Sequence, residues 1–273
     1  MRIVLCDTNK TVCSLWRKML PKSLLDKGKV EVHNTTFEAL AHKLYKTNVN
    51  QLSKEGTRPY CSPEKCVVVS PGNSFGYLGG GFDLALCEYY GGKPFETWFR
   101  SKLNNEYYPI GSSTLIDAYD YFLPESSDKI RHILHVPTIV APSHSSFMKA
   151  EPLRSGYEPV FNATWNSLRS FPSCCDTIIM SGLYTGYAGV PAEVSCKSMS
   201  FAITLYHLCE ILPKDVVNLL TMYYLGYPFE DFFLHTASEQ LELLGIDKEQ
   251  LIAFDVTRDF IDAIIPSHLL DSL

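Results

Sequence analysis

The sequence predicts an α/β fold in which a largely parallel β-sheet is covered by helices on both faces. Three observations support this prediction. Short apolar runs typical of buried strands alternate with apolar stripes that have the spacing of amphipathic helices. Two of the strand candidates run directly into glycine-rich turns, and each turn opens a helix. The chain contains no internal repeat, low-complexity tract or block of charge, so we expect one large domain over residues 1–273.

The first part of the chain alternates strands and helices. We expect a strand at residues 2–6, followed by a helix whose apolar face spans residues 12–19. A second strand is predicted at residues 29–33 and a second helical stripe at residues 37–44. Residues 48–63 are polar and contain Pro, Gly and Ser, so we expect a surface connection there.

The rest of the chain continues this alternation and carries the irregular segments. Strands are predicted at residues 67–69, 112–118, 131–136, 177–181 and 216–224, and helices at residues 84–87, 95–103, 161–168, from 193 onward, 239–244 and 260–265. Residues 141–159 show little periodicity, which is typical of long functional loops that partly cover a site. We expect insertions near residues 104–130 and 141–158, and a C-terminal helical extension near residues 228–273.

The strand at residues 67–69 leads into the first glycine-rich turn. Asn73 follows the strand, and three consecutive glycines at residues 79–81 precede Asp83 and a helix start. Unshielded backbone N–H groups and the positive end of the helix dipole favour an anion such as phosphate here. The turn lacks both the Lys-Ser/Thr of a P-loop and the Gly-x-Gly-x-x-Gly of a dinucleotide fold. A flexible turn in which Asp83 only caps its helix explains the same residues.

Composition and charge narrow the class of partner. The net charge of −6 argues against a chain whose main task is to bind long nucleic acid. No apolar run approaches the roughly 20 residues that span a bilayer, so no membrane partner is expected, and Met1 leads directly into a strand instead of a signal peptide. The nine cysteines are odd in number, and several lie in apolar runs, as reduced thiols do. We therefore expect an intracellular protein, in the cytoplasm, the nucleus or both.

The spacing of cysteines and carboxylates predicts neither a metal nor a cofactor. Cys61 and Cys66 are separated by four residues, and no second pair or His partner stands at zinc spacing. No carboxylate cluster at ligand spacing accompanies the glycine turns. We therefore expect an activity that survives EDTA.

Two separated motifs resemble the binding loops of macro domains. Ser-Pro-Gly-Asn-Ser at residues 70–74, followed by Gly-Gly-Gly-Phe-Asp at 79–83, is similar to the first loop, Asn-Ala-Ala-Asn, a short spacer and Gly-Gly-Gly-Val. The segment at residues 180–191 resembles the second loop, Gly-x-x-Thr-Gly-x-x-Gly-x-Pro. Cys-Asp-Thr-Asn at 6–9 and His-Val-Pro-Thr at 135–138 resemble fungal members assigned as probable ADP-ribose 1″-phosphate phosphatases. The resemblance implies a three-layer α/β/α fold with a mixed, mostly parallel central sheet.

The same resemblance implies the activity and the site. The expected reaction removes the 1″-phosphate from ADP-ribose 1″-phosphate, a by-product of tRNA splicing, to give ADP-ribose. The residues expected to bind this small-molecule substrate are Asp7, Gly72, Gly79, Gly80, Gly81, Phe82, Leu183, Tyr184, Thr185, Gly186, Tyr187 and Ala188. The residues expected at the distal ribose, as the catalytic group, are Asn73, Asp83 and His135. From the residues alone, an Asn that stabilises its own turn and a His satisfied in the core explain Asn73 and His135.

The sequence departs from the macro-domain pattern in two places. Many macro domains carry a Gly-Asp-Ile/Leu-Thr turn whose Asp contacts adenine, but residues 33–36 read His-Asn-Thr-Thr, which leaves Asp7 as a candidate substitute. Ser70 replaces the first Asn of the first loop. Three other functions stay open: a reader that only binds ADP-ribose, a hydrolase that removes ADP-ribose from modified proteins, and a nucleotide-binding regulator with an unrelated ligand.

Overall fold

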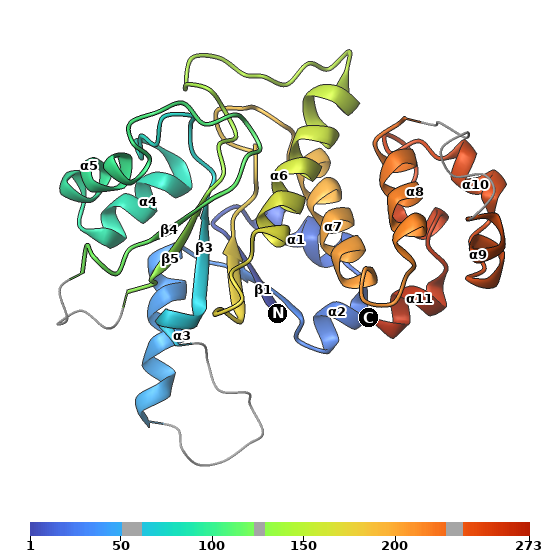
Figure 1. Ribbon diagram of the computed structural model, residues 1–273, viewed down its shortest axis with the longest axis horizontal. Helices are drawn as coiled ribbons and strands as arrows, with labels where there is room; N and C mark the ends of the chain where they lie inside the picture. Colours follow the sequence, from blue (N-terminus) through green and yellow to red (C-terminus); the bar gives the residue numbers. More distant parts are fainter. Residues whose placement is uncertain (51–61, 123–128, 228–236) are drawn as a thin grey trace.

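The computed structural model describes residues 1–50, 62–122, 129–227 and 237–273 (Figure 1). Its strands are β1 (Arg2–Asp7), β2 (Val30–Asn34), β3 (Cys66–Ser70), β4 (Thr114–Asp117), β5 (His132–His135) and β6 (Thr177–Met180). Its helices are α1 (Lys10–Met19), α2 (Lys22–Asp26), α3 (Phe37–Asn50), α4 (Gly81–Tyr90), α5 (Lys93–Lys102), α6 (Glu158–Arg169), α7 (Ala192–Leu208), α8 (Lys214–Tyr224), α9 (Ser238–Leu243), α10 (Lys248–Ala253) and α11 (Ser267–Ser272). None of these described helices combines the length and apolar character needed to span a membrane.

The six strands form one mixed sheet in the order β2-β1-β6-β3-β5-β4. All neighbouring pairs are parallel except β4 and β5, which run antiparallel with Asp117 opposite His132. The central strand β3 is buried along its whole length, as expected for a β-branched run between two helical layers. The predicted three-layer α/β/α fold with a mostly parallel sheet is therefore confirmed.

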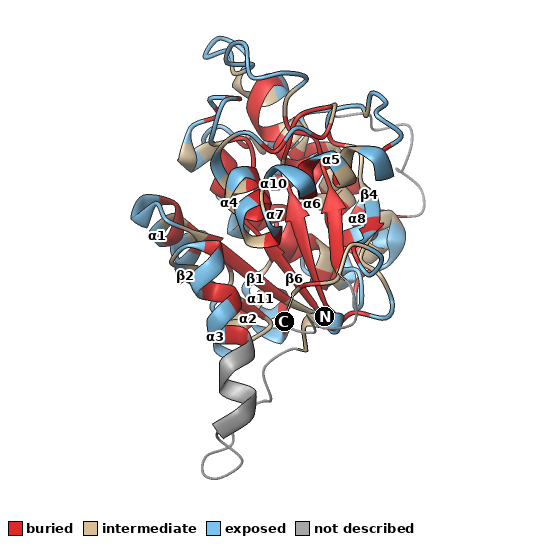
Figure 2. Ribbon diagram, turned by 90° about the vertical axis from the view of Figure 1, so that its left-hand side faces the viewer, coloured by how far each residue is buried: buried red, intermediate tan, exposed pale blue. Residues whose placement is uncertain are grey.

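The two faces of the sheet bury separate cores, because successive side chains of a strand point to opposite faces. On one face, Val67 and Val69 of β3 join a core to which α1, α6, α7 and the C-terminal helices contribute. On the other, Val68 packs with apolar residues of α3, α4 and α5. Figure 2 shows the buried strands between helices whose outer surfaces are exposed.

The prediction of a strand at residues 216–224 is wrong, because this stretch forms helix α8 after Pro213. Its buried residues, Val216, Leu220 and Tyr223 among them, recur at the spacing of one helix face. The helix predicted at residues 239–244 is present as α9, whereas residues 260–265 contain only a short 3-10 turn, Ile261–Ala263.

The helix before β6 begins earlier than the sequence indicates. A π-helical turn, Leu153–Tyr157, runs directly into α6, so the long loop predicted at residues 141–159 is shorter in the structure. A side chain at Gly156 would meet Phe147 and Val194 at 2.9 Å, so this turn packs closely on its neighbours. Cys61, most of the predicted connection at residues 48–63, part of the insertion near 104–130 and the first residues of the extension near 228–273 lie outside the described residues.

Candidate functional site

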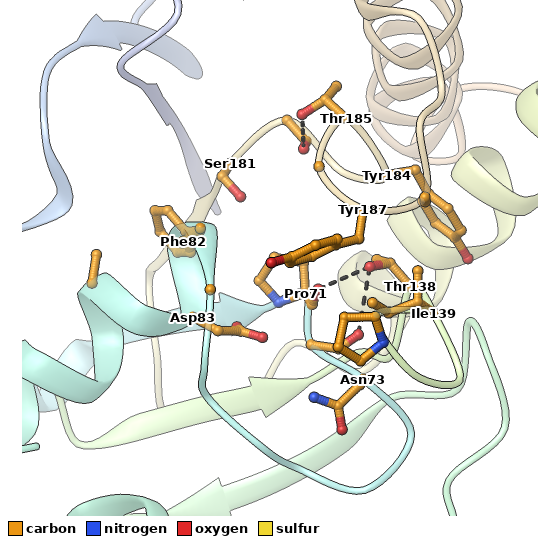
Figure 3. Close-up of a pocket in the computed structure, with 18 of the residues that line it drawn as sticks. Pro71, Asn73, Phe82, Asp83, Thr138, Ile139, Ser181, Tyr184, Thr185 and Tyr187 are labelled. Carbon is orange, nitrogen blue, oxygen red and sulfur yellow. Dashed lines mark hydrogen bonds between the residues drawn. The ribbon is translucent and has the colours of Figure 1, made fainter. Parts of the chain in front are cut away.

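A cavity of about 740 Å³ opens at the carboxyl edge of the parallel strands. Strands β1, β6, β3 and β5 are neighbours, so the loops that follow them meet at this edge, where ligands bind in open α/β sheets. Each of these four loops contributes residues to the lining. The close-up in Figure 3 labels residues of the loops that follow β3, β5 and β6. Both glycine turns predicted from the sequence are among them.

The first glycine turn connects β3 to α4 and leaves several amides open. Gly80 is the N-cap of α4, and no side chain caps this helix. Gly81 has a φ of 56°, a left-handed conformation that favours glycine. Within the described part of the chain, the N–H groups of residues 79–82 make no hydrogen bond. These amides and the positive end of the α4 dipole therefore offer an anion site on the cavity wall.

The second glycine turn follows β6 and has the same property. Thr185 Oγ1 donates to the Gly182 carbonyl at 2.8 Å, and Tyr184 holds an unusual left-handed conformation with φ of 64°. The N–H groups of residues 185–188 make no hydrogen bond to other described residues, although all four residues line the cavity. The two turns thus present open backbone donors to one space.

Asp83 is a buried carboxylic acid on the cavity wall. It lies in the first turn of α4, is 6% exposed, and accepts a hydrogen bond from Ser70 Oγ at 2.8 Å. Burial raises the pKa of the Asp83 carboxyl from 3.8 to about 7, although the Ser70 hydrogen bond acts in the opposite direction. At neutral pH this group therefore exchanges between the acid and the carboxylate.

Asn73 also lines the cavity, but its side chain is engaged in its own loop. Its amide nitrogen donates to the Tyr77 carbonyl at 2.7 Å, and its oxygen accepts from the N–H groups of Phe75 and Tyr77 at 3.1 and 3.3 Å. These bonds are those of an Asn that stabilises a turn. One hydrogen of the amide nitrogen is left for a ligand.

His135 and Leu183 are the two predicted site residues that do not line the cavity. Both side chains are fully buried, and Leu183 belongs to the core beneath the second turn. His135 stacks edge-on with Phe99 and Tyr108, and burial lowers its pKa to about 4, so the imidazole is neutral at neutral pH. A side chain at Gly72 would meet Asp83 Oδ2 at 2.7 Å and His135 Cε1 at 3.4 Å, so His135 lies behind Gly72, beside the acid.

Asp7 lies at the end of β1 and faces the second turn. One carboxylate oxygen accepts from the Asn9 N–H at 2.8 Å and the other from the Gly182 N–H at 3.2 Å. Asp7 therefore ties the first strand to the second glycine turn and also lines the cavity. The remaining predicted binding residues line the cavity as well: Gly72, Gly79, Gly80, Gly81, Phe82, Tyr184, Thr185, Gly186, Tyr187 and Ala188.

Sequence reasoning missed residues that complete the wall. Thr138, after β5, donates from its hydroxyl to the Pro71 carbonyl at 2.9 Å and from its N–H to the Gly72 carbonyl at 2.8 Å. Thr35 and Thr36 follow β2 and also line the cavity. Their position after a parallel strand is the signal that would have found them, because that is where ligand-binding loops gather.

Two contacts bring other segments over the second turn. The Ala188 carbonyl accepts from the N–H groups of Ser146 and Phe147, which anchors the loop before α6 to the turn. The exposed Tyr187 ring reaches across to the first turn, where a side chain at Gly80 would meet it at 3.1 Å (Figure 3). Ala141 and Pro142, at the start of the segment 141–159, also line the cavity. That this segment partly covers the site stays a prediction.

The fold and the site define a three-layer α/β/α protein whose cavity is framed by two glycine turns with open amides. The sequence pattern of the macro-like domain family matches residues 1–273. The chain therefore belongs to the macro-like domain family. Among curated proteins, an uncharacterized protein of Aquifex aeolicus (strain VF5) is 29% identical over 134 residues, which are 49% of this chain and 69% of that protein.

Solved structures of macrodomains are also similar to this chain. A mutant macrodomain of Oceanobacillus iheyensis with ADPR is 21% identical, with a TM-score of 0.38, over 50% of this chain and 68% of that one. The same macrodomain with ADP is 19% identical, with a TM-score of 0.38, over 52% and 69%. The macrodomain of Mycobacterium tuberculosis DarG is 16% identical, with a TM-score of 0.39, over 55% and 88%.

Proposed function

We propose that this cavity binds ADP-ribose and that the chain removes the 1″-phosphate from ADP-ribose 1″-phosphate, as the fungal members it resembles are assigned to do. The observation that carries the proposal is the convergence of two open-amide turns and one buried acid, Asp83, on a single cavity. Its volume of about 740 Å³ lies within the roughly 300–1,000 Å³ typical of small-molecule sites. The family assignment supports ADP-ribose as the ligand.

In this proposal the two turns divide the ligand between them. The amides of residues 185–188 bind the diphosphate, and the glycines at residues 79–81 let the backbone approach the distal ribose. The amide hydrogen of Asn73 that its loop leaves unused contacts a ribose hydroxyl. Asp7 is the candidate for adenine recognition, because it lines the cavity from the end of β1, which β6 separates from β3 and its glycine turn.

Asp83 supplies the chemistry in this proposal. Water attacks the phosphorus, the bond between phosphorus and the sugar oxygen breaks, and the protonated Asp83 gives its proton to that leaving oxygen. The attacking water leaves as part of the inorganic phosphate, and the proton that it loses restores the acid form of Asp83. A pKa of about 7 leaves a large share of the acid form available at neutral pH. The open amides at the start of α4 offset the negative charge that develops. His135, which lies behind Gly72, is a positioning residue in this scheme.

A second candidate, a reader that binds ADP-ribose without turnover, is favoured by one observation. Of the three residues predicted to act together, Asn73 is engaged in its own loop and His135 does not line the cavity. Asp83 is then the one of the three that offers a reactive group to the cavity. We place the reader function second because Asp83 lies on the cavity wall with a pKa suited to proton transfer.

Phosphorus NMR of the purified chain mixed with ADP-ribose 1″-phosphate in EDTA-containing buffer tests both functions. We expect a growing inorganic phosphate signal beside intact ADP-ribose. Asp83→Ala should abolish it with little loss of affinity, whereas Asp26→Asn, at an exposed position of helix α2 outside the cavity, should leave it unchanged.

Other results would point elsewhere. Unchanged substrate with broadened diphosphate signals indicates a reader, or a hydrolase for another ADP-ribose ester, with modified proteins as the next substrates. Activity that EDTA abolishes and magnesium restores contradicts metal independence. No binding of ADP-ribose at millimolar concentration indicates an unrelated ligand.

We also propose that residues 1–273 form one macro domain, with insertions near 104–130 and 141–158 and a helical extension near 228–273, which the match over residues 1–273 supports.

A further inference from the structure

Three side chains with metal-binding atoms gather at the edge of the sheet opposite the cavity. His132 is the first residue of β5, and Cys174 and Cys175 lie in the turn just before β6. Strand β3 separates β5 from β6 in the sheet, so the cluster reaches across the start of the central strand. This edge also carries the N-terminus of the chain, because Arg2 pairs with Thr177 (Figure 2).

Two of the three distances in this cluster are close to those of a tetrahedral metal site. Cys174 Sγ lies 3.6 Å from His132 Nε2 and 4.0 Å from Cys175 Sγ, and the three ligand atoms all lie within 4.8 Å of one another. With Zn–S near 2.3 Å and Zn–N near 2.1 Å, a tetrahedral zinc site requires about 3.6 Å between S and N and about 3.8 Å between two sulfurs. The first two separations therefore need only small adjustments around an ion.

The environment suits a thiophilic cation. His132 is 6% exposed, so its imidazole is largely withdrawn from solvent. Cys174 is exposed whereas Cys175 is buried, so the cluster has one side open to solvent for a water ligand.

The other ring nitrogen of His132 adds an independent sign. His132 Nδ1 is buried and has no hydrogen-bond partner among the described residues. Asp117, directly opposite on β4, interacts electrostatically with this histidine. In zinc sites the second ring nitrogen is commonly oriented by a carboxylate, and Asp117, which binds Arg131 here, is the carboxylate on the neighbouring strand.

We propose that His132, Cys174 and Cys175 bind one Zn²⁺ ion, with water as the fourth ligand. Two thiolates and one imidazole are a ligand set suited to zinc, in contrast to the oxygen ligands that magnesium and calcium prefer. The ion ties the start of β5 to the turn before β6 across β3, far from the cavity, and so stabilises the fold. This site is independent of the proposed function, because none of its ligands lines the cavity.

The test uses the full chain after reduction and removal of metal. Zinc affinity is measured by competition with a chromophoric chelator, and thiolate coordination by the near-ultraviolet charge-transfer absorption of the cobalt(II) form. We expect one zinc per chain and a higher unfolding temperature when zinc is added. Cys174→Ser and Cys175→Ser should each weaken zinc binding by about 100-fold or more and lower the intensity of the cobalt–thiolate band.

Cys209→Ser is the matched control, because Cys209 is another exposed cysteine and does not belong to the cluster, so this variant should bind zinc as the wild type does. Cys174→Ser keeps the test decisive, since an exposed side chain can be changed with little effect on folding. The proposal is overturned if the wild type takes up no zinc, if the two serine variants bind it as tightly as the wild type, or if Cys209→Ser weakens binding equally.

Discussion

Replacing Asp83 by Asn should stabilise the protein, and the gain should depend on pH. Asn keeps an oxygen that accepts the Ser70 hydrogen bond but cannot ionise, so the substitution isolates the cost of a buried charge. In the wild type the folded state holds the Asp83 proton up to a pKa of about 7, whereas the unfolded chain releases it near its ordinary pKa of 3.8.

The sign follows from proton binding. Between these two pKa values the folded state binds more protons than the unfolded state, so stability falls as the pH rises, and the full cost is present above about pH 7. Since one pKa unit corresponds to about 1.4 kcal/mol, the cost approaches about 4 kcal/mol. D83N should therefore match the wild type near pH 4 and exceed its free energy of unfolding by up to about 4 kcal/mol near pH 8.

Urea unfolding followed by tryptophan fluorescence over this pH range measures the difference. Asp26→Asn is the control, because Asp26 is exposed on α2 and its replacement should give no pH-dependent gain. A D83N advantage that is the same at both ends of the range, or that is absent near pH 8, would refute the reasoning. The same variant should lose turnover in the proposed reaction, which would make Asp83 a site where stability is traded for activity.

Four further substitutions test the geometry around the cavity. Gly72→Ala puts a methyl group 2.7 Å from Asp83 Oδ2 and should cost about 1–3 kcal/mol in urea unfolding; an unchanged midpoint would contradict the close approach. Gly81→Ala should cost about 1 kcal/mol because φ is 56°, whereas Gly79→Ala, which has open space and no positive φ, should stay within about 0.5 kcal/mol, as paired thermal melts can check. Leu183→Ala should cost about 2–5 kcal/mol and leave the affinity of the folded fraction for ADP-ribose unchanged, since Leu183 belongs to the core; calorimetry that finds weaker binding in the folded fraction would restore it to the site.

The strands were readable from the sequence because local pattern and burial agree in them. Residues 67–69 are β-branched and bounded by turn formers, and they lie in the centre of the sheet. The strand prediction at residues 216–224 was wrong because their β-branched and aromatic content is typical of a strand. Packing of this segment against the rest of the core selects the helix instead. Val216 and Leu220 are both buried on one face, a spacing that the composition conceals.

Much of the cavity lining was also predictable, because glycine turns after parallel strands gather at one edge. The sequence does not show which side chains near the turns face the cavity and which are buried beneath it. His135 and Leu183 stand at the expected positions of their sequence motifs, yet both side chains are fully buried and do not line the cavity. The contact of Ser70 with Asp83, 13 residues away, and that of Cys174 with His132, 42 residues away, arise only when the sheet assembles. Predictions of zinc sites from local spacing cannot detect the second contact.

The described residues that line the cavity include two carboxylates, Asp7 and Asp83, but no Lys or Arg. A diphosphate would thus be held by neutral amide dipoles. Because the lining offers no basic side chain, binding would not release salt anions that had been associated with a positive charge. Ionic strength should then have little influence on the dissociation constant, in contrast to sites that neutralise phosphates with basic side chains. Titration calorimetry with ADP-ribose at low and high salt measures this directly, and a steep loss of affinity with salt would reveal a basic group that joins the ligand from elsewhere in the chain.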